Sequence, residues 1–332
     1  MRIAINGFGR IGRTVYRILA ENNIHEIVAI NDLSEPGALA YLLKYDTVMG
    51  RFDGEVHFEN GYLITADQKV KLLSEKDPAL LPWNNLEIDI VIEATGVFRT
   101  KSQLEKHITA GGKKVILTVP AKDEIDYTVV LGVNETGIKE THNILSNASC
   151  TTNCLAPMAK VIYENFGIVQ GVINTVHAYT NDQRLADVPH KDWRRSRAAA
   201  ENIIPTSTGA ARAVGKVLPE LDGKLDGIAS RVPVPDGSVV DLFVELEKTV
   251  SVEDVNEAVL EASQSDRMKN ILEYSTSPIV SSDIIGNSSS SIYDSDCTRV
   301  IGGKFLRVLN WYDNEWGYSN RVVDLMDYLD NL

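Results

Sequence analysis

Cys150 is the residue whose type and position most directly suggest chemistry. It lies in the segment SCTTNC (149–154), between a predicted short strand (143–146) and a predicted helix (151–165). A helix N-terminus carries free N–H groups and a partial positive charge, which lower the pKa of a thiol and favour the thiolate. Because a thiolate is a strong nucleophile at neutral pH, this segment predicts covalent catalysis at Cys150.

The other two cysteines have different predicted roles. Cys154 comes four residues later on the same face of the predicted helix, and we expect a small buried residue there. The spacing C-x3-C differs from the C-x2-C of redox motifs, and no second cluster of cysteines could complete a zinc site. Cys297 lies in a polar stretch and is expected to be structural. The sequence therefore predicts no metal site.

A thiol nucleophile needs a base, and the sequence contains six histidines. His177 ends the predicted strand Val172–Val176, and a side chain at the end of a rigid strand is well placed for proton transfer. On its own, a histidine at a strand end more often has a structural role. The others are expected outside the catalytic site: His25 and His57 near solvent, His107 on a surface helix, His142 before a strand and His190 in a long loop.

A glycine motif near the N-terminus predicts a dinucleotide-binding site. Residues 7–12 read GFGRIG, which matches G-x-G-x-x-G, and they lie between a predicted strand and a predicted helix. In such a turn Gly7 permits the tight bend, Gly9 lets the backbone approach a pyrophosphate, and Gly12 lets helix and strand pack closely. The helix N-terminus then presents N–H groups to the phosphates. The alternative is a glycine-rich turn without a ligand.

Asp32 predicts which dinucleotide binds. It follows a second predicted strand (26–31) and lies 32 − 12 = 20 positions after the last glycine of the motif, the spacing of a ribose-binding acid. A carboxylate there accepts hydrogen bonds from both ribose hydroxyls and repels a 2′-phosphate, so NAD is favoured over NADP. Asp32 could instead be a solvated strand end or a helix cap.

Short apolar runs and helical patterns alternate through the first part of the chain. The runs are rich in Val and Ile and nearly continuous in hydrophobicity, as is typical of parallel strands buried on both faces. Strand–helix–strand alternation predicts an α/β domain, a Rossmann-type doubly wound parallel sheet over residues 1–149. The predicted strands are 3–6, 26–31, 88–95, 114–118, 129–133 and 143–146, and the predicted helices are 11–22 and 101–110.

The pattern changes after Cys150. A helix (151–165), which must accommodate Pro157, leads into longer and more alternating strands. These predict an α+β catalytic domain, residues 150–316, with a mixed or antiparallel sheet. The polar segment 184–207 is long for a loop without a function. The predicted strands are 167–180, 225–234, 238–248 and 305–312, and the later predicted helices are 210–218 and 318–329.

Composition limits the class of protein. The chain has 332 residues, 44% of them hydrophobic, with 33 Lys+Arg against 46 Asp+Glu, a net charge of −13. This balance indicates a globular protein of about two domains. The acidic charge argues against nucleic acid as the main partner, and no apolar run reaches the ~20 residues of a membrane span. Three cysteines and an N-terminus unlike a secretion signal favour a cytoplasmic location.

Four motifs together resemble the phosphorylating glyceraldehyde-3-phosphate dehydrogenase family. They are NGFGRIGR (6–13), SNASCTTNCLAP (146–157), HAYTNDQR (177–184) and WYDNEWGY (311–318), and the likeness runs from Arg2 to about Leu325. The resemblance implies a homotetramer of two-domain subunits. It also implies that the C-terminal helix, about 317–332, packs on the nucleotide domain.

The resemblance implies a reaction in which glyceraldehyde 3-phosphate, NAD and inorganic phosphate give 1,3-bisphosphoglycerate and NADH. Cys150 corresponds to the nucleophile, which forms a hemithioacetal and then a thioester. His177 corresponds to the base that activates the thiol and assists departure of the hydride. Phosphate then attacks the thioester, so one difficult step is divided into two easier ones.

The resemblance also implies binding residues. One phosphate site is lined by Thr180, Asp182 and Arg231, and the other by Ser149, Thr151, Arg195, Thr208 and Gly209. Arginine suits phosphate because its planar fork donates paired hydrogen bonds, although an isolated arginine more often forms a surface salt bridge. Cofactor contacts are implied for Gly7, Phe8, Gly9, Arg10, Ile11, Gly12, Asp32, Thr95, Thr118, Pro189, Asn314 and Tyr318, with Asn314 on the nicotinamide carboxamide.

The sequence departs from the family pattern at three places. Arg212 replaces a usual lysine, VPDG (234–237) replaces TPNV, and TVP (118–120) replaces SAP. One alternative is erythrose-4-phosphate dehydrogenase, which has the same Cys/His pair but usually lacks the AYTND run and the Thr-Gly phosphate helix. Another is a non-catalytic NAD-binding scaffold protein on an inherited fold.

Overall fold

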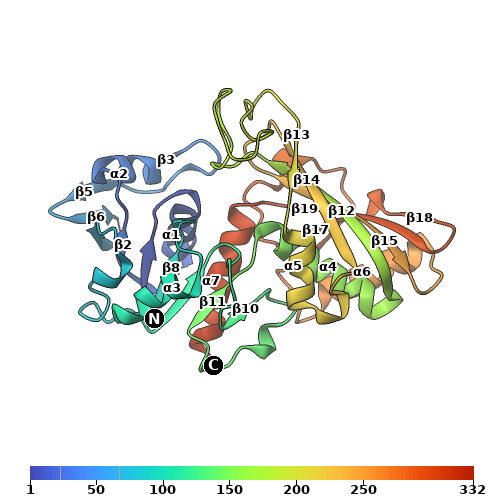
Figure 1. Cartoon of the computed structure of the whole chain (residues 1–332), viewed down its shortest axis with the longest axis horizontal. Coiled ribbons are helices and arrows are strands. Elements are labelled where there is room, and N and C mark those ends of the chain that lie inside the picture. The colour runs from blue at the N-terminus through green and yellow to red at the C-terminus, as the bar shows by residue number, and fades with distance from the viewer. Residues whose placement is uncertain (23, 67) are drawn as a thin grey trace. The chain divides into compact units, whose positions relative to one another are not determined.

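The computed structural model describes residues 1–22, 24–66 and 68–332 (Figure 1). The described chain forms two compact units. The first comprises Met1–Val129, Thr136–Ala148 and Ser319–Leu332, and the second Val130–Glu135 and Ser149–Tyr318. Within the described ranges, every helix is too short or too polar to span a membrane.

The first unit is built on a sheet with the strand order β10-β11-β9-β8-β1-β2-β7-β6-β5. The strands from β10 to β7 are all parallel, which confirms the predicted Rossmann-type sheet. All four residues of β8 are buried, as expected for a strand covered on both faces. The bounds are β1 Arg2–Asn6, β2 Glu26–Asn31, β5 Val56–Glu59, β6 Tyr62–Thr65, β7 Lys69–Leu73, β8 Ile90–Glu93, β9 Lys114–Leu117, β10 Tyr127–Thr128 and β11 Ile144–Ser146.

Helices and one small hairpin complete this unit. The helices are α1 Arg10–Asn22, α2 Pro36–Lys44, α3 Lys101–Thr109 and most of α7 Trp316–Asp330, and β3 Tyr45–Asp46 pairs with β4 Gly50–Arg51. The residues of α7 from Ser319 onward belong to the first unit. His25 Nε2 lies 2.8 Å from Asp327 Oδ1, so a hydrogen bond joins α7 to the segment before β2.

The structure differs from the sequence predictions at residues 129–133, of which Val130–Val133 belong to the second unit, and at short strands of the first unit. Residues 129–133 do not form a strand, because Val133 N–H donates to Val130 O in a turn that Gly132, at φ +81°, allows. The edge strand is instead the two-residue β10. The antiparallel strands β5 and β6 were not predicted, since they are short and β5 is mostly exposed.

Two histidines predicted near solvent are buried, at 4% exposure for His25 and 0% for His107. His107 Nδ1 accepts a hydrogen bond from Trp83 Nε1 at 3.0 Å, and Nε2 lies 3.0 Å from Glu93 Oε2. An indole N–H only donates, so Nε2 carries the imidazole proton and donates it to Glu93. The helical pattern around His107 could not reveal these partners, which come from other elements.

The second unit is built on a mixed sheet with the strand order β13-β14-β12-β15-β19-β17-β16, and β18 pairs with β19. β12 is parallel to β14 and antiparallel to β15, which confirms the predicted mixed sheet. Helices α4 and α5 pack on one face of it (Figure 1). The bounds are α4 Cys150–Phe166, β12 Ile168–Ala178, β13 Ile204–Ser207, α5 Ala210–Val217, β14 Leu225–Val232, β15 Ser238–Leu246, α6 Val252–Gln264, β16 Leu272–Ser275, β17 Ser291–Asp294, β18 Arg299–Ile301 and β19 Phe305–Tyr312.

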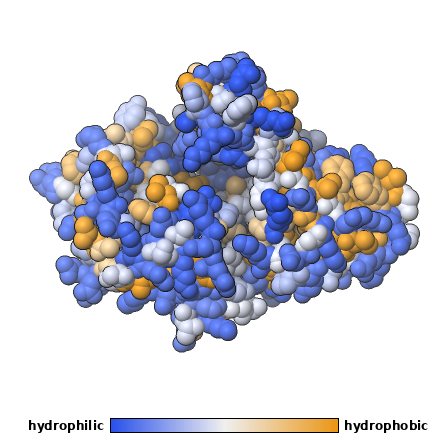
Figure 2. Space-filling view, viewed as in Figure 1, coloured by the Kyte–Doolittle hydropathy of each residue, from blue (hydrophilic) through white to orange (hydrophobic). Residues whose placement is uncertain are grey.

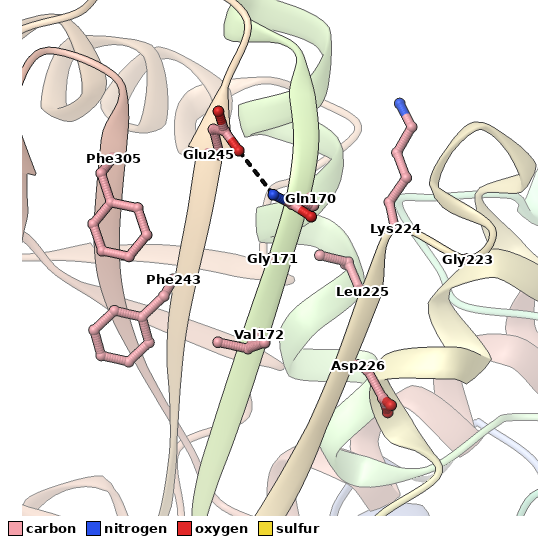
Figure 3. Close-up of a pocket in the computed structure, with 10 residues that line it drawn as sticks. All are labelled: Gln170, Gly171, Val172, Gly223, Lys224, Leu225, Asp226, Phe243, Glu245 and Phe305. Atoms are coloured by element: carbon pink, nitrogen blue, oxygen red, sulfur yellow. Dashed lines mark hydrogen bonds between the residues drawn. The ribbon is translucent and has the colours of Figure 1, made fainter.

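The other face of this sheet exposes apolar side chains. Val172 is 58% exposed, Ile228 52% and Phe305 46%. Phe243 and Phe305 stack on neighbouring strands with ring centroids 6.4 Å apart, beside a hydrogen bond from Gln170 Nε2 to Glu245 Oε2 of 2.9 Å (Figure 3). A shallow pocket on this face is lined by residues that include Gln170, Val172, Phe243, Glu245 and Phe305.

Candidate active site

Cys150 is the first residue of α4, as the sequence predicted. Ser149 is the N-cap, with an extended backbone conformation, and its Oγ accepts a hydrogen bond from Thr152 N–H at 3.1 Å. This cap ends the preceding loop and starts the helix at the cysteine. Cys154, one turn later, is completely buried, which confirms its predicted packing role.

His177 lies next to Cys150. It is the penultimate residue of β12, it is 5% exposed, and its Nε2 is 3.5 Å from Cys150 Sγ. The other ring nitrogen, Nδ1, lies 2.7 Å from Ala178 O. A carbonyl oxygen only accepts, so Nδ1 carries the proton and Nε2 directs its lone pair at the thiol. The imidazole is thus oriented to accept the proton of Cys150.

The electrostatics of the pair differ from the expectation. Burial raises the pKa of the Cys150 thiol, although Arg231 and hydrogen bonds from Thr151 act in the opposite direction. The helix N-terminus alone predicted a lowered value. Burial and the charge of Arg231 lower the pKa of His177 to about 3. Burial therefore disfavours an isolated charge on either group, and the 3.5 Å contact gives the thiol proton a possible acceptor at Nε2.

Tyr312 contacts the site residues but was not predicted from the sequence. Its hydroxyl lies 2.8 Å from Thr151 Oγ1 and 2.9 Å from Thr175 Oγ1, and its ring meets the His177 ring edge-on at a centroid distance of 5.9 Å. Tyr312 therefore ties α4 to β12 and limits rotation of the imidazole. The available signal was its place in the WYDN segment at the end of a strand.

Arg231 brings the first predicted phosphate set together. Arg231 on β14 lies opposite His177 on the neighbouring strand β12. Its Nη1 donates to Thr180 Oγ1 at 2.8 Å and to Ala178 O at 3.0 Å. Thr180 donates in turn to Asp182. Arg231 Nε is buried and has no hydrogen-bond partner in the described part of the chain. An unsatisfied guanidinium N–H on the strand next to His177 suits an anionic group of a substrate.

The second predicted set is not separate from the first. Arg195 pairs with Asp182 of the first set, and its Nε donates to Thr206 Oγ1 at 2.9 Å. Thr206 was not predicted in the site. Ser149 Oγ is used in the helix cap and Thr151 Oγ1 in the bond to Tyr312.

Thr208 and Gly209 of that set lie at the start of α5, as predicted. Thr208 Oγ1 accepts a hydrogen bond from Ala210 N–H at 3.2 Å. Gly209 is the residue before the helix, and a Cβ built on it meets no atom within 4 Å. The backbone at this helix N-terminus is therefore open to an approaching group.

The glycine turn of the first unit has the shape that a pyrophosphate requires. Gly7 has φ +94°, and a Cβ there would collide with the backbone of Thr95. A Cβ on Gly12 would collide with Gly7 O, so both positions need glycine. A Cβ on Gly9 would meet no atom within 4 Å, which leaves open space above the backbone. These features fit a dinucleotide phosphate over the turn.

Asp32 closes the same turn. Its Oδ2 accepts a hydrogen bond from Phe8 N–H at 2.8 Å, and its Oδ1 accepts one from Ser34 N–H at 2.9 Å. Each oxygen keeps a second lone pair, so the carboxylate can still accept ribose hydroxyls. Asp32 is therefore more than a solvated strand end.

The remaining predicted cofactor residues lie in both units. In the first unit, Thr95 N–H donates to Glu93 Oε1 at 2.9 Å, and Thr118 Oγ1 donates to Glu93 O at 3.0 Å. Arg10 forms a salt bridge of 2.6 Å with Asp46, and Ile11 lies in α1. In the second unit, Asn314 Oδ1 accepts from Ser238 Oγ at 2.6 Å, Pro189 O accepts from Arg184 Nε at 3.3 Å, and Tyr318 is buried in α7. Among the described residues, no cluster of His, Cys, Asp and Glu could hold a metal ion.

A Rossmann-type unit with an open pyrophosphate turn, together with a thiol in contact with an imidazole, defines a class of oxidoreductase that combines dinucleotide binding with covalent thiol chemistry. Residues 1–101 match the family model described as the glyceraldehyde 3-phosphate dehydrogenase NAD binding domain, and residues 149–314 match that of the C-terminal domain. The chain belongs to the glyceraldehyde-3-phosphate dehydrogenase family and is an NAD-dependent enzyme.

Relatives named glyceraldehyde-3-phosphate dehydrogenase are similar over the whole chain. The protein from Streptomyces coelicolor is 57% identical, covering 100% of this chain and 99% of its own. Those from Borreliella burgdorferi and Geobacillus stearothermophilus are 57% and 54% identical, each covering 99% of this chain and 99% and 98% of their own. The family resemblance predicted from the motifs is therefore confirmed.

Proposed function

We propose that this protein oxidises and phosphorylates glyceraldehyde 3-phosphate to 1,3-bisphosphoglycerate, with NAD and inorganic phosphate, in glycolysis or gluconeogenesis. The observation that carries the proposal is the 3.5 Å contact between Cys150 Sγ and His177 Nε2, beside the unsatisfied Nε of Arg231. A thiol, a base and an anion-binding group are what a phosphorylated aldehyde requires. The whole-chain similarity to relatives of that name supports the same reaction.

In the first half of the reaction, Cys150 Sγ attacks the aldehyde carbon while His177 Nε2 accepts the thiol proton. That proton passes to the aldehyde oxygen, so the product is a neutral hemithioacetal. His177 then removes the hydroxyl proton as the hydride leaves the carbon, and a thioester on Cys150 results. Bound NAD supplies the acceptor for this hydride.

In the second half, inorganic phosphate attacks the thioester carbon. The new C–O bond forms, the C–S bond breaks, and Cys150 leaves as the thiolate, which recovers its proton from His177. We assign Thr180, Asp182 and Arg231 to one anion-binding set, and Ser149, Thr151, Arg195, Thr208 and Gly209 to the other. The Arg195–Asp182 pair couples these two sets.

We assign NAD binding to residues 1–149 with the C-terminal helix (about 317–332), and catalysis to residues 150–316. The open turn at Gly9 and the carboxylate of Asp32 support this assignment. Phe8, Arg10, Ile11, Thr95 and Thr118 would contribute to the same site from the first unit. Pro189, Asn314 and Tyr318 are the proposed contributors from the second unit.

The Asp32→Asn variant is expected to lose most of its preference for NAD over NADP. The amide still accepts a hydrogen bond from Phe8 N–H, but it no longer repels a 2′-phosphate. We expect the Kd for NAD to rise roughly 10-fold, the effect of weakening hydrogen bonds to a charged group. Fluorescence titration with each dinucleotide measures this, with Asp53→Asn on an exposed turn as control. An unchanged ratio of the two Kd values would contradict the role of Asp32.

We also propose a homotetramer that works in the cytoplasm. The apolar face of the second sheet supports self-association, since Val172, Ile228 and Phe305 expose apolar surface there. In Figure 2, hydrophobic side chains gather at the end of the second unit where Figure 1 labels β15 and β18. Sedimentation equilibrium tests this proposal, and a monomer at micromolar concentration would contradict it.

A spectrophotometric assay of NADH formation tests the function. kcat/KM is compared for glyceraldehyde 3-phosphate and erythrose 4-phosphate, with and without inorganic phosphate. We expect the three-carbon aldehyde to be preferred and turnover to depend on phosphate. Equal or better turnover of the four-carbon sugar would favour erythrose-4-phosphate dehydrogenase. A non-catalytic scaffold protein would be favoured if the enzyme showed no turnover and if Cys150 were alkylated only as slowly as free cysteine.

A further inference from the structure

Two buried carboxyl groups are in contact in the second unit. Asp236 lies just before β15 and Asp313 just after β19, and each is 1% exposed. Oδ2 of Asp236 is buried and receives no hydrogen bond from a donor among the described residues, and the Asp236 and Asp313 carboxyl groups are close enough to share a hydrogen bond. Neither side chain has a role in the reaction as proposed above.

One proton must be shared by this pair. Asp313 accepts three backbone N–H groups, from Gly286 at 2.7 Å, Glu315 at 2.8 Å and Trp316 at 2.6 Å. Asp236 accepts only two, both at Oδ1, from Gly237 at 2.8 Å and Asn314 at 3.3 Å. Two touching buried carboxylates cannot both ionise at neutral pH, and the one with more donors is the better anion. The proton therefore belongs on Asp236 Oδ2, which donates it to Asp313.

The charges around Asp236 favour its neutral form. Burial raises the pKa of Asp236 to about 9, and the acidic neighbours Asp313 and Glu315 contribute in the same direction. The 3-10 turn Ser281–Ile284, which packs against Gly237, presents another acid, Asp283, whose Oδ2 accepts Val280 N–H. A negative charge on Asp236 would also raise the pKa of the Cys150 thiol, at the start of α4.

The pair is linked to the active site through a directed chain of hydrogen bonds. Asn314 N–H donates to Asp236, and Asn314 Oδ1 accepts from Ser238 Oγ at 2.6 Å. Ser238 Oγ in turn accepts from Ala178 N–H at 3.0 Å, and Ala178 O accepts from the ring of His177. The serine hydroxyl must donate to Asn314 Oδ1, because an amide oxygen only accepts. The side-chain amide of Asn314 is therefore oriented with its oxygen toward Ser238 and its N–H₂ group pointing away from Ser238.

We propose that Asp236 is a positioning residue that works as a neutral acid: its proton joins it to Asp313, holds Asn314 in one orientation and keeps a negative charge away from Cys150. The inference rests on the proposed function, because Cys150 and Asn314 are taken there as nucleophile and cofactor contact. It adds one requirement to the proposed site: the carboxyl group of Asp236, which is not among the predicted site residues, must stay protonated.

The Asp236→Asn variant tests whether the group is protonated. Unfolded Asp236 ionises near 3.8, so from that pH up to the folded pKa the folded protein holds one extra proton and loses stability as the pH rises. Asparagine donates N–H to Asp313 at every pH and has no such dependence. We expect the Tm of Asp236→Asn minus that of wild type to increase steadily from pH 5 to pH 9. A constant difference would overturn the proposal, and this readout needs no catalysis.

A second comparison tests the positioning. We expect Asp236→Asn to bind NAD within about twofold of wild type at pH 7, whereas Asp236→Ala, which lacks the donor, binds roughly 10-fold more weakly, the effect of one lost hydrogen bond in a buried network. Fluorescence titration of NAD gives both Kd values. Equal affinity of the alanine variant and wild type would overturn the positioning role. If the alanine variant does not fold, a greater than tenfold loss in Asp236→Asn would overturn it instead. Failure of the proposed reaction would appear as absent turnover with these stability and binding results unchanged.

Discussion

The Cys150→Ser variant is expected to lose kcat/KM by roughly 10⁴- to 10⁶-fold, as enzymes do when a covalent nucleophile is removed. Serine keeps the size of the side chain and the helix start at Ser149, so the fold should not change. A hydroxyl is far less acidic and less nucleophilic than a thiol, so a serine at this position does not replace the cysteine as the attacking group. The rate of NADH formation at saturating phosphate measures the loss.

Cys297→Ser is the matched control for this experiment. Cys297 is also a partly exposed free cysteine, but it lies in a turn between β17 and β18. We expect the control to keep wild-type activity and to incorporate label from iodoacetamide at Cys150. Substantial turnover by Cys150→Ser, or loss of activity in the control alone, would remove Cys150 from the mechanism.

The parallel sheet and the position of the nucleophile could be predicted because their signals are local. All four residues of β8 are buried, and the first three are Ile or Val. A nearly continuous apolar run of this kind is typical of a parallel strand covered on both faces. Ser149 is a good N-cap before a helical pattern, so the sequence locates Cys150 at a helix start. The glycine spacing similarly predicted the steric needs of Gly7 and Gly12.

The features that were missed depend on contacts between elements distant in sequence. His107 is buried because Trp83 and Glu93 satisfy both ring nitrogens. The pKa of Cys150 is raised because burial outweighs the helix terminus, and sequence spacing does not report burial. Arg195 joins the first phosphate set because the loop folds back to reach Asp182. Each of these outcomes requires the tertiary structure.

The Asp236–Asp313 contact is a similar case with a functional consequence. The sequence has VPDG (234–237) where the family usually has TPNV, so Asp236 stands in place of an asparagine. In the structure this aspartate lies in a buried site whose neighbours are acidic, and only its protonated form satisfies both carboxyl groups. A neutral aspartic acid can donate a hydrogen bond to Asp313, as an asparagine amide would. Aspartate in place of asparagine therefore preserves the donor, but only at a pH where the carboxyl group is protonated.

The second large effect is expected for His177→Asn. Asparagine can still donate to Ala178 O, so the end of β12 is preserved, but it cannot accept the proton of Cys150. We expect kcat to fall by roughly 10²- to 10⁴-fold, the usual contribution of a general base. Steady-state NADH formation measures this, and His57→Asn, an exposed position on β5, is the control that should behave as wild type.

The rate at which Cys150 is alkylated in His177→Asn shows whether the variant has lost only the base or has a generally disturbed active site. Without His177, the thiolate must form by ionisation of a thiol whose pKa burial raises, and the proton must leave for solvent rather than cross the 3.5 Å contact. The rate of reaction with iodoacetamide at pH 7 should therefore fall, and its pH midpoint should move upward. If His177→Asn reacts as fast as wild type at pH 7, the imidazole does not activate the thiol, and the acid–base role must belong to another group near Arg231.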